Sequence, residues 1–223
     1  MRKVVIIVAA GSGSRMQSEL PKQFIELNGL PVLMHTINKF YEYDSHIEIR
    51  LVLPDDHVKH WLQICERFIF PIRHEIFSGG SNRFFSVKNG LQDIGEDAIV
   101  AIHDGVRPLV SLETINRGFK LAAKKGTAIP VVDVHETIRH LSQSVSKTVP
   151  RVDYRLVQTP QVFKSSILAK AYNQEFHSSF TDDASVVENM GIEVSLYEGN
   201  RENLKITTPN DLVVASAYLN HNS

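Results

Sequence analysis

An apolar run that leads straight into a glycine-rich loop constrains this chain more than any other feature of its sequence. Residues 4–8 contain no polar side chain, which is typical of a strand buried on both faces of a parallel sheet. The loop that follows, residues 9–22, reads Ala-Ala-Gly-Ser-Gly-Ser-Arg-Met-Gln-Ser-Glu-Leu-Pro-Lys. Because ligands of such sheets lie beyond the carboxyl ends of the strands, we expect this loop to be a binding loop.

The loop combines backbone freedom with positive charge. Gly11 and Gly13 allow main-chain N–H groups to approach anionic oxygens closely. Arg15 and Lys22 add full charges at two separate points along one ligand, and Pro21 stiffens the approach to Lys22. Two glycines alone also fit an ordinary strand-to-helix turn. The two cations favour a site for a polyphosphate.

The loop lacks the residues of the two commonest phosphate-binding motifs. A Walker loop needs Gly-Lys-Ser or Gly-Lys-Thr at a fixed spacing, and no such triplet occurs here. A dinucleotide loop needs a third glycine, where Met16 stands, and an acidic residue about 20 positions on, where Asn28 and Gly29 stand. These departures argue against a P-loop enzyme and weaken the interpretation as a Rossmann oxidoreductase.

The order of the predicted elements places the chain in the α/β class. Apolar strands alternate with segments of helical periodicity, which predicts a mostly parallel, Rossmann-like sheet with helices on both faces. Ser81 and Ser111 are expected to cap two helices, and Gly126 lies just past the end of the second. After the first strand we expect strands at residues 47–53, 72–77, 98–102, 127–132, 193–197 and 204–206, and helices beginning near residues 31, 55, 81, 111, 164, 182 and 208.

Residues 134–158 break this alternation. Residues 134–141 and 145–152 are rich in β-formers and polar at alternate positions, and a turn at residues 142–144 separates them, so we expect a projecting β-hairpin. Since a lone two-stranded ribbon is only marginally stable in water, the hairpin is expected to pack on a second copy of the chain. The expected organisation is a single domain, residues 1–223, with a dimerisation arm at residues 134–158.

Composition limits the partners of the chain. Its formal net charge is −1, so the chain as a whole is not suited to nucleic acid or to an anionic membrane. Cys65, the single cysteine, lies in a helical apolar pattern typical of a core thiol and fits a reducing compartment. Arg2 and Lys3 before an apolar run imitate a secretion signal, but that run is of minimal length and suits a buried strand. We expect an unprocessed, cytoplasmic protein.

Two further motifs follow predicted strands. The segment His-Asp-Gly-Val-Arg-Pro at residues 103–108 places Asp104 three residues before Arg107. Asp104 suits a divalent metal or a ribose hydroxyl and Arg107 a phosphate, unless the two simply form an ion pair that holds the loop. The segment Gly-Gly-Ser-Asn-Arg-Phe-Phe-Ser at residues 79–86 offers close backbone approach and a hydroxyl one turn into a helix. It suits the edge of a nucleobase, or only a helix cap.

Further candidate site residues lie in the second half of the chain, and the candidate cations are spread over its whole length. Thr137 and Arg151 lie on the predicted hairpin, and Thr181 precedes the two acids that open a later helix. No nucleophile elbow of the form Gly-x-Ser-x-Gly occurs, so nothing indicates covalent catalysis. The candidate cations exceed what one triphosphate needs and indicate a site for two phosphorylated substrates: Arg15, Lys22, Arg107, Arg151 and Lys205.

Six motifs, met in order along nearly the whole chain, resemble those of the 2-C-methyl-D-erythritol 4-phosphate cytidylyltransferases of isoprenoid precursor synthesis. They are Ala-Ala-Gly-x-Gly-x-Arg-Met followed by Pro-Lys-Gln, Gly-Gly-x-x-Arg-x-x-Ser-Val, His-Asp-x-x-Arg-Pro, Thr-Pro-Gln, Thr-Asp-x-Ala and Asn-x-Lys-Ile-Thr. The resemblance implies a homodimer of nucleotidyltransferase domains joined by hairpin arms. It also implies CTP and a sugar-alcohol phosphate as substrates, with a divalent metal, usually Mg²⁺.

The resemblance further implies a role for each matching residue. Catalytic roles fall to Arg15 and Lys22 at the α-phosphate of CTP, and to Arg151 and Lys205. The nucleotide would be bound by Ala9, Ala10, Gly11, Gly13, Gly80, Ser81, Arg83, Ser86 and Asp104, of which Asp104 is also the candidate metal ligand. The sugar phosphate would be bound by Arg107, Thr137, Thr159 and Thr181, with Thr137 and Arg151 reaching across from the arm of a second copy.

One departure from the family pattern concerns the acceptor. The family more often has two alanines where Gly105 and Val106 stand. Ribitol 5-phosphate cytidylyltransferases are similar in the nucleotide half, so ribitol phosphate is an alternative acceptor, although Arg151 favours methylerythritol phosphate. A nucleotide-sensing module without turnover is a further alternative, but it would not need Lys22, Arg151 and Lys205.

Overall fold

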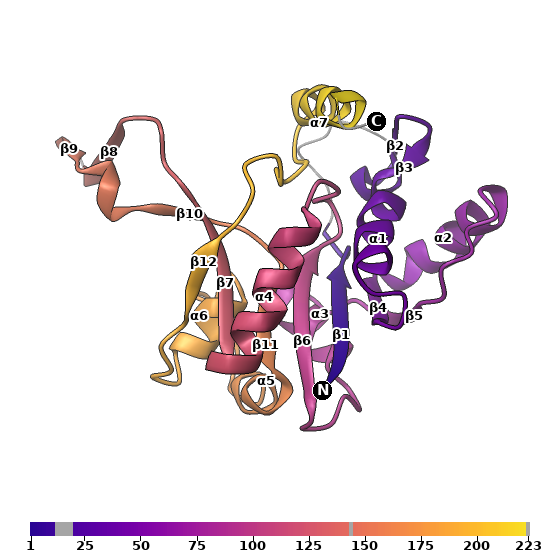
Figure 1. Cartoon of the computed structure of the whole chain (residues 1–223), viewed down its shortest axis with the longest axis horizontal. Coiled ribbons are helices and arrows are strands. Elements are labelled where there is room, and N and C mark those ends of the chain that lie inside the picture. Colours follow the sequence, from indigo (N-terminus) through magenta and orange to yellow (C-terminus); the bar gives the residue numbers. More distant parts are fainter. Residues whose placement is uncertain (12–19, 143–144, 222–223) are drawn as a thin grey trace.

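Within residues 1–11, 20–142 and 145–221, which the computed structural model describes, one mixed sheet of eight strands forms the centre of the protein (Figure 1). β1 (Arg2–Val8) lies between β4 (Glu48–Leu53) and β6 (Ala98–Asp104) and is parallel to both. β5 (Glu75–Ser78) extends this parallel part beyond β4. The expectation of an α/β protein with a mostly parallel sheet is confirmed.

The other half of the sheet contains antiparallel strands. β11 (Gln161–Lys164) is inserted antiparallel between β6 and β7 (Thr127–Asp133). β10 (Arg155–Val157) is also antiparallel to β7, whereas β12 (Leu196–Glu198) is parallel to it. The sequence did not predict β11, because four residues are too few to display a period.

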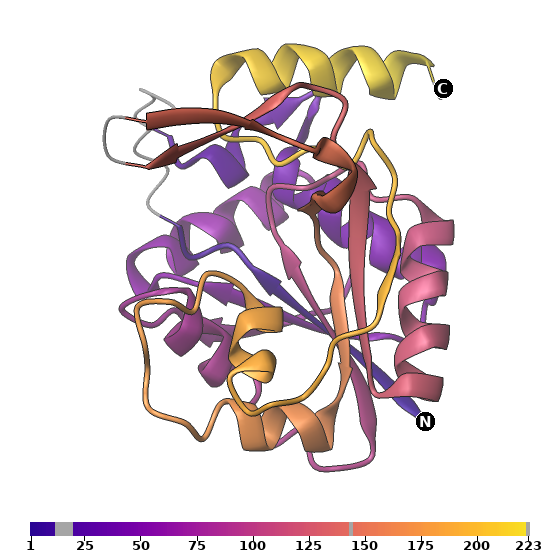
Figure 2. The same ribbon diagram turned by 90° about the vertical axis from the view of Figure 1, so that its left-hand side faces the viewer.

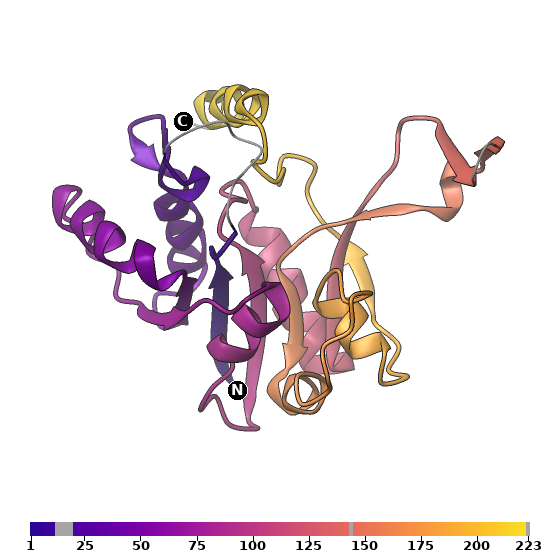
Figure 3. The same ribbon diagram turned by 180° about the vertical axis from the view of Figure 1, so that it is seen from behind.

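Helices cover both faces of the sheet, as expected (Figures 1 and 3). Along β1, Val5 and Ile7 face one layer and Val4 and Ile6 the other, because successive side chains of a strand point to opposite faces. All four are fully buried, and burial of each stabilises the fold by about 1.5–3 kcal/mol. The first layer contains α1 (Val32–Tyr43), α2 (Asp55–Arg67) and α4 (Leu112–Lys125), and the second contains α3 (Arg83–Gly90), α5 (Ser165–Ala171) and α6 (Asp183–Glu188).

Helix ends follow the local signals in the sequence, with one exception. The Ser111 hydroxyl accepts a hydrogen bond from the amide three residues on, and Gly126 ends α4 with a φ of 93°, as predicted. The prediction of Ser81 as the cap of α3 is wrong, since Asn82 takes that position and its Oδ1 accepts from the Phe85 amide at 3.2 Å. Asn caps a helix as well as Ser does, so the sequence alone does not separate the two.

The final helix, α7 (Pro209–His221), lies across the end of the sheet at which β1 and β6 finish (Figures 1 and 2). The prediction of a strand at residues 204–206 is wrong. This segment joins no sheet of the described residues, and its Ile206 amide donates a single bond to the Val106 carbonyl at 2.9 Å. Ile206 is buried with Val106 and Ala215, so its apolar character serves the packing of α7. No helix in the described residues is long and apolar enough to cross a membrane.

The predicted hairpin is formed by β8 (Ile138–Ser142) and β9 (Val145–Val149), which pair antiparallel and stand away from the main sheet (Figures 1 and 3). Its turn at residues 143–144 lies outside the described residues. A short helix, η3 (Arg151–Asp153), follows the hairpin before the chain returns to the sheet at β10. Leu141 and Val145 are 74% and 68% exposed, so the hairpin carries apolar side chains that its own chain does not cover.

Two small elements follow the loop of residues 12–19, which the structure does not describe. The short helix η2 (Lys22–Phe24) precedes a ribbon of β2 (Glu26–Leu27) and β3 (Leu30–Pro31). The turn of that ribbon has positive φ at Asn28 and Gly29, as a tight turn between paired strands requires.

Acidification is expected to destabilise the fold through His74. Its Nε2 accepts a hydrogen bond from Trp61 Nε1 at 2.9 Å, which leaves Nδ1 to donate to the Ile72 carbonyl at 2.8 Å. Burial lowers the pKa of His74 below its ordinary value of 6.5. Below that pH the unfolded chain takes up a proton that the folded chain resists, so the free energy of unfolding decreases as the pH falls.

Urea titrations at pH 7.5 and pH 5.5 test this expectation. His74→Gln should lower the free energy of unfolding by about 1 kcal/mol at pH 7.5, through loss of the Trp61 bond, and should reduce its further decrease at pH 5.5. His46→Gln is the matched control, because the His46 side chain is 95% exposed. Equal pH dependence in the wild type and in His74→Gln would contradict the assignment.

Candidate active site

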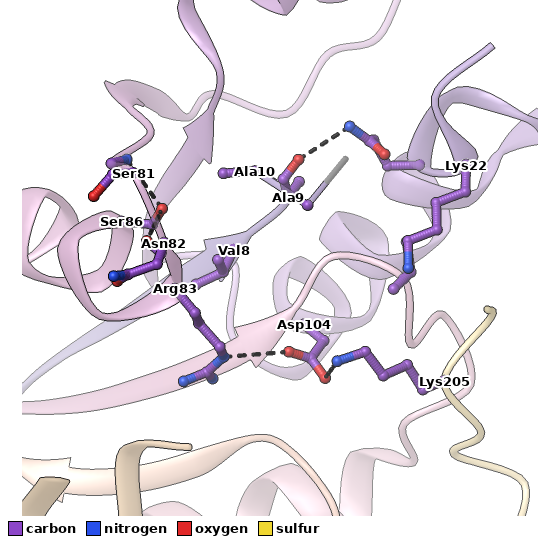
Figure 4. A pocket seen from close by; sticks show the side chains of 14 residues that line it. Val8, Ala9, Ala10, Lys22, Ser81, Asn82, Arg83, Ser86, Asp104 and Lys205 are labelled. Carbon is purple, nitrogen blue, oxygen red and sulfur yellow. Dashed lines mark hydrogen bonds and ion pairs between the residues drawn. The ribbon is translucent and has the colours of Figure 1, made fainter. Parts of the chain in front are cut away.

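A cavity of about 340 Å³ opens where the carboxyl ends of β1 and β6 meet the start of α3 (Figure 4). This is the edge of the sheet at which the sequence predicted a ligand. Val8, Gln23, Asn82 and Val106 line it although the sequence did not single them out as site residues. The predicted site residues that line it are Ala9, Ala10, Gly11, Lys22, Gly80, Ser81, Arg83, Ser86, Asp104 and Lys205.

The turn before α3 forms one wall of the cavity and is tightly packed. The Gly80 amide donates to the Ser86 hydroxyl at 3.0 Å, and that hydroxyl donates to the Asn82 carbonyl at 2.8 Å. A Cβ atom on Gly80 would lie 2.3 Å from Cβ of Phe85 and 2.7 Å from its carbonyl carbon. Only glycine therefore fits at position 80 of this turn.

The resemblance to cytidylyltransferases implies that this turn binds CTP, so Gly80→Ala is expected to weaken nucleotide binding at least tenfold, because its methyl group displaces the backbone of residues 80–86. Calorimetric titration with CTP measures this effect. Gly11→Ala serves as a control for stability, since no described heavy atom lies within 4 Å of a Cβ built there. Its unfolding midpoint should match that of the wild type, whereas that of Gly80→Ala should fall. Unchanged CTP affinity in Gly80→Ala would show that the turn does not contact the nucleotide.

The wall at the end of β1 is held by main-chain contacts. The Ala9 amide donates to the Val52 carbonyl at 2.9 Å, and the Ala9 carbonyl accepts from Gln23 Nε2 at 3.0 Å. Gln23 is 1% exposed and belongs to η2, so it ties the first residue of the loop to the short helix that begins with Lys22. The only signal for Gln23 in the sequence was its place after Pro-Lys in a family motif.

Gly105 allows the ends of β1 and β6 to approach each other closely. Its amide donates to the Val8 carbonyl at 2.9 Å, and a Cβ atom on it would lie 2.9 Å from Cβ of Ala9. Glycine stands here in place of the family's usual alanine, and the two strand ends pack so tightly that a Cβ atom would be crowded.

Asp104 stands among three cations. Its Oδ2 lies 3.1 Å from Arg107 Nε. The same oxygen lies 3.1 Å from Lys205 Nζ, and Oδ1 lies 3.8 Å from Arg83 Nε (Figure 4). Burial alone would raise the pKa of Asp104, but the charges of Arg83, Lys205 and Arg107 outweigh burial and hold that pKa well below its usual range. The carboxylate is therefore ionised at neutral pH.

Arg107 forms the ion pair that the sequence left open as an alternative to phosphate binding. Besides Asp104, its guanidinium donates to the Asn203 carbonyl at 2.8 Å. Its side chain is only 12% exposed, and it is not among the described residues that line the cavity. In this arrangement Arg107 joins β6 to the segment that carries Lys205.

Thr159 lies beneath Asp104 and outside the cavity lining. Its hydroxyl accepts from the Asp104 amide at 3.1 Å and lies 3.0 Å from Nδ1 of His103. His103 Nε2 lies 3.1 Å from the Arg107 carbonyl, so a neutral ring with its proton on Nε2 satisfies every contact. Burial lowers the pKa of His103 to about 4, which keeps that ring neutral.

The remaining predicted residues lie away from the cavity lining. Thr181 is exposed just before α6, and its amide donates to the Ser185 hydroxyl at 3.1 Å. Thr137 and Arg151 are exposed beside the hairpin, which stands apart from β1 and β6 (Figure 1). Gly13 and Arg15 lie outside the described residues.

The described residues contain no group of three or more His, Cys, Asp or Glu side chains that could hold a metal by themselves. Among the described residues that line the cavity, Asp104 is the one acid, and its Oδ1 is less engaged by cations than its Oδ2. Mg²⁺ is commonly held by one or two carboxylates together with phosphate oxygens of the substrate. The donor set therefore fits Mg²⁺ if a nucleotide supplies the other ligands.

Comparison with known proteins identifies the family. The sequence profile described as IspD: 2-C-methyl-D-erythritol 4-phosphate cytidylyltransferase matches residues 3–221. The chain belongs to this family. Two relatives that carry the cytidylyltransferase name are a protein of Bacteroides thetaiotaomicron, 55% identical, and one of Bacteroides fragilis, 56% identical. In both cases the alignment covers 98% of this chain and 100% of the relative.

Solved structures of IspD proteins share the fold. The 2-C-methyl-D-erythritol 4-phosphate cytidylyltransferase of Thermus thermophilus is 30% identical, with a TM-score of 0.80 over 99% of this chain and 100% of that one. The 4-diphosphocytidyl-2C-methyl-D-erythritol synthase of Anaerococcus prevotii is 28% identical, with a TM-score of 0.83 over 98% of this chain and 96% of that one. The family predicted from six motifs is confirmed.

Proposed function

We propose that this chain joins CTP and 2-C-methyl-D-erythritol 4-phosphate to give 4-diphosphocytidyl-2-C-methyl-D-erythritol and pyrophosphate. One observation carries the proposal: Lys22, Lys205 and the ionised Asp104 meet the glycine turn of residues 79–86 around a single cavity, in a chain of the IspD family. Relatives that are 55–56% identical over their full length carry the name of this activity.

The reaction is a substitution at phosphorus. An oxygen of the acceptor phosphate attacks the α-phosphorus of CTP, and the bond from that phosphorus to the bridging oxygen of pyrophosphate breaks. Because the nucleophile is already an anion, no general base is needed, and catalysis consists of positioning and of stabilising charge. The neutral His103, with both ring nitrogens engaged below the cavity, supports this view.

Lys22 is assigned to the α-phosphate, where negative charge builds up in the transition state, and Arg15 is assigned the same role. Gln23 supports the position of Lys22, since it anchors η2 to the end of β1. A lysine held in this way stabilises developing charge without reorganising during the reaction.

The nucleotide is assigned to the walls formed by β1 and α3. Ala9, Ala10, Gly11 and Gly13 are assigned to the phosphates and ribose, and the backbone of Gly80 with Ser81 and Ser86 is assigned to the cytosine edge. Asp104 is assigned to the ribose or to Mg²⁺ through Oδ1. When bound, Mg²⁺ would neutralise charge on the phosphates of CTP.

The acceptor is assigned to the side of the cavity that contains Lys205, together with Thr181, which precedes α6. Thr137 and Arg151 would be supplied by the arm of a second copy, so the proposed active form is a homodimer. The exposed Leu141 and Val145 on the arm support this, because an isolated ribbon gains little from apolar side chains in water. Sedimentation of the wild type and of a chain with Leu141→Lys and Val145→Lys tests whether the arm holds the dimer.

A cytoplasmic location is part of the proposal. Cys65 is half-buried, and burial raises the pKa of its thiol to about 11, so it behaves as an inert core residue suited to a reducing compartment.

The decisive experiment supplies CTP and Mg²⁺ with either methylerythritol phosphate or ribitol 5-phosphate and measures pyrophosphate release. Release with methylerythritol phosphate, and a new diphosphate signal by phosphorus NMR, is the expected result. Release with ribitol phosphate alone would overturn the acceptor assignment. Tight CTP binding without release for either acceptor would favour a sensing module, although the relatives described above do not support these alternatives.

A further inference from the structure

Arg83 makes a contact that its place in a nucleotide-binding turn does not explain. Its two terminal nitrogens donate to the two carboxylate oxygens of Asp183 at 2.7 and 2.6 Å. Arg83 is the first residue of α3, whereas Asp183 is the first residue of α6, 100 positions later in the chain. The fork-to-fork geometry is the strongest that an arginine and a carboxylate can form.

If Arg83 turned to a phosphate, the Asp183 carboxylate would have no positive partner in the protein interior. Its side chain is fully buried, and its other contact is the Tyr172 hydroxyl, which donates to Oδ1 at 2.6 Å. Breaking one side of a buried ion pair is strongly unfavourable, because the remaining charge has lost its water. Although Arg83 lines the cavity, its guanidinium is thus committed to Asp183.

The aromatic rings beside this pair strengthen the same contact between helices. Tyr172 stacks on Phe84, the residue after Arg83, with ring centroids 4.9 Å apart. Phe180 also stacks on Phe84, with centroids 5.7 Å apart. The segment that leads into α6 is therefore packed directly on the start of α3.

The first turn of α6 is also held by a second set of hydrogen bonds, which connect it to the sheet and not to the nucleotide turn. Gln161 of β11 donates from Nε2 to Asp182 at 2.8 Å and accepts from the Ala184 amide at 2.8 Å. Arg83 instead connects α6 to the start of α3, three residues after the tightly packed Gly80. It also faces Asp104 at 3.8 Å.

We propose that Arg83 is a positioning residue that acts through Asp183: the pair sets the position of the first turn of α6, and of Thr181 beside it, relative to the nucleotide turn. The inference rests on the proposed function in assigning the acceptor to the side of Thr181. The nucleotide turn keeps its own contacts, the Asn82 cap and the Gly80–Ser86 bond, when Arg83 is replaced. Loss of the pair should therefore affect the acceptor more than CTP.

The test compares Arg83→Met, Asp183→Asn and the double variant. Each single variant should raise the KM for methylerythritol phosphate at least tenfold, while the dissociation constant for CTP with Mg²⁺, measured by calorimetry, changes less than threefold. The double variant should be no worse than the poorer single variant, because both changes remove one interaction. Arg83→Lys should not restore the wild-type KM, since an ammonium group cannot form the fork.

A direct role in phosphate binding gives a different pattern and would overturn the proposal. Arg83→Met would then weaken CTP binding at least tenfold, whereas Asp183→Asn would leave CTP binding unchanged. Arg67→Met is the matched control, because Arg67 forms an exposed ion pair with Glu26 and should leave both constants unchanged.

Hydrogen exchange separates this inference from the proposed function. Amides of residues 181–188 should exchange faster in both single variants, while those of β1 stay as protected as in the wild type. If the wild type turns over neither acceptor, the proposed function fails, yet the CTP titration and the exchange data still decide whether Arg83 acts through Asp183. The double variant removes both charges and leaves none unpaired, so it can be measured even if a single variant fails to fold. Unchanged exchange in all three variants would refute the coupling.

Discussion

Lys22→Ala is expected to lower kcat by about 10²–10³-fold, a loss of about 3–4 kcal/mol of transition-state stabilisation, comparable to the removal of one preorganised oxyanion donor. Lys22 lines the cavity at the start of η2, and the neighbouring Gln23 anchors that helix to the end of β1. Because the charge acts mainly in the transition state, the dissociation constant for CTP should change much less than kcat. Pyrophosphate release under saturating substrates measures the effect.

Lys39→Ala is the matched control for Lys22→Ala. Lys39 forms an ion pair with Glu42 within α1 at 3.0 Å and takes no part in the cavity lining of the described residues. Its removal should leave kcat within twofold of the wild type. If Lys22→Ala retained kcat within threefold, Lys22 would have no role at the α-phosphate.

Asp104→Asn is expected to lower the free energy of unfolding by about 3 kcal/mol and to reduce turnover at least 100-fold. The change leaves Arg83, Arg107 and Lys205 around a neutral group, and breaking a buried ion pair from one side typically costs about 3–5 kcal/mol. The pKa of Asp104 is lowered in the folded state, so its contribution to stability is complete above its ordinary pKa of 3.8 and is lost only as the pH falls below that value. Urea unfolding at pH 7 therefore reports the full effect.

Glu26→Gln controls for the loss of one negative charge. Glu26 pairs with Arg67 at 3.0 Å, and the two side chains are 45% and 69% exposed, so neutralising Glu26 should change stability by less than about 1 kcal/mol. If Asp104→Asn also changed the free energy of unfolding by less than about 1 kcal/mol, the carboxylate would not be needed to balance the three cations.

The sequence predicted those parts of the fold that depend on nearby residues. The caps of α4 at Ser111 and Gly126, and the buried central strands β1 and β6, follow from patterns within a few positions and are as expected. β11 depends on long-range pairing with β6 and β7, and no local pattern reveals such pairing. Leu204 and Ile206 are apolar and suggested a strand, but they pack beneath α7, while Lys205 between them pairs with Asp104.

The same distinction holds for the site. The carboxyl ends of parallel strands meet at one edge, so β1 and β6 brought Ala9 and Asp104 together as predicted. The sequence allows an Asp104–Arg107 ion pair to be expected, because only three positions separate the two residues. The Arg83–Asp183 pair crosses 100 positions, and a motif that names Arg83 as a nucleotide ligand gives no sign of its buried partner.

The insertion of β11 between β6 and β7 has a consequence for synthesis on the ribosome. β6 can complete its hydrogen bonding only after residues 161–164 have emerged, and until then its apolar edge is open to other chains. β6 is thus synthesised well before its partner β11, and Lys205, which pairs with Asp104 at the end of β6, is synthesised later still. While residues 105–164 are being made, the open edge of β6 exposes the nascent chain to aggregation, and the cavity gains Lys205 only when translation is nearly complete.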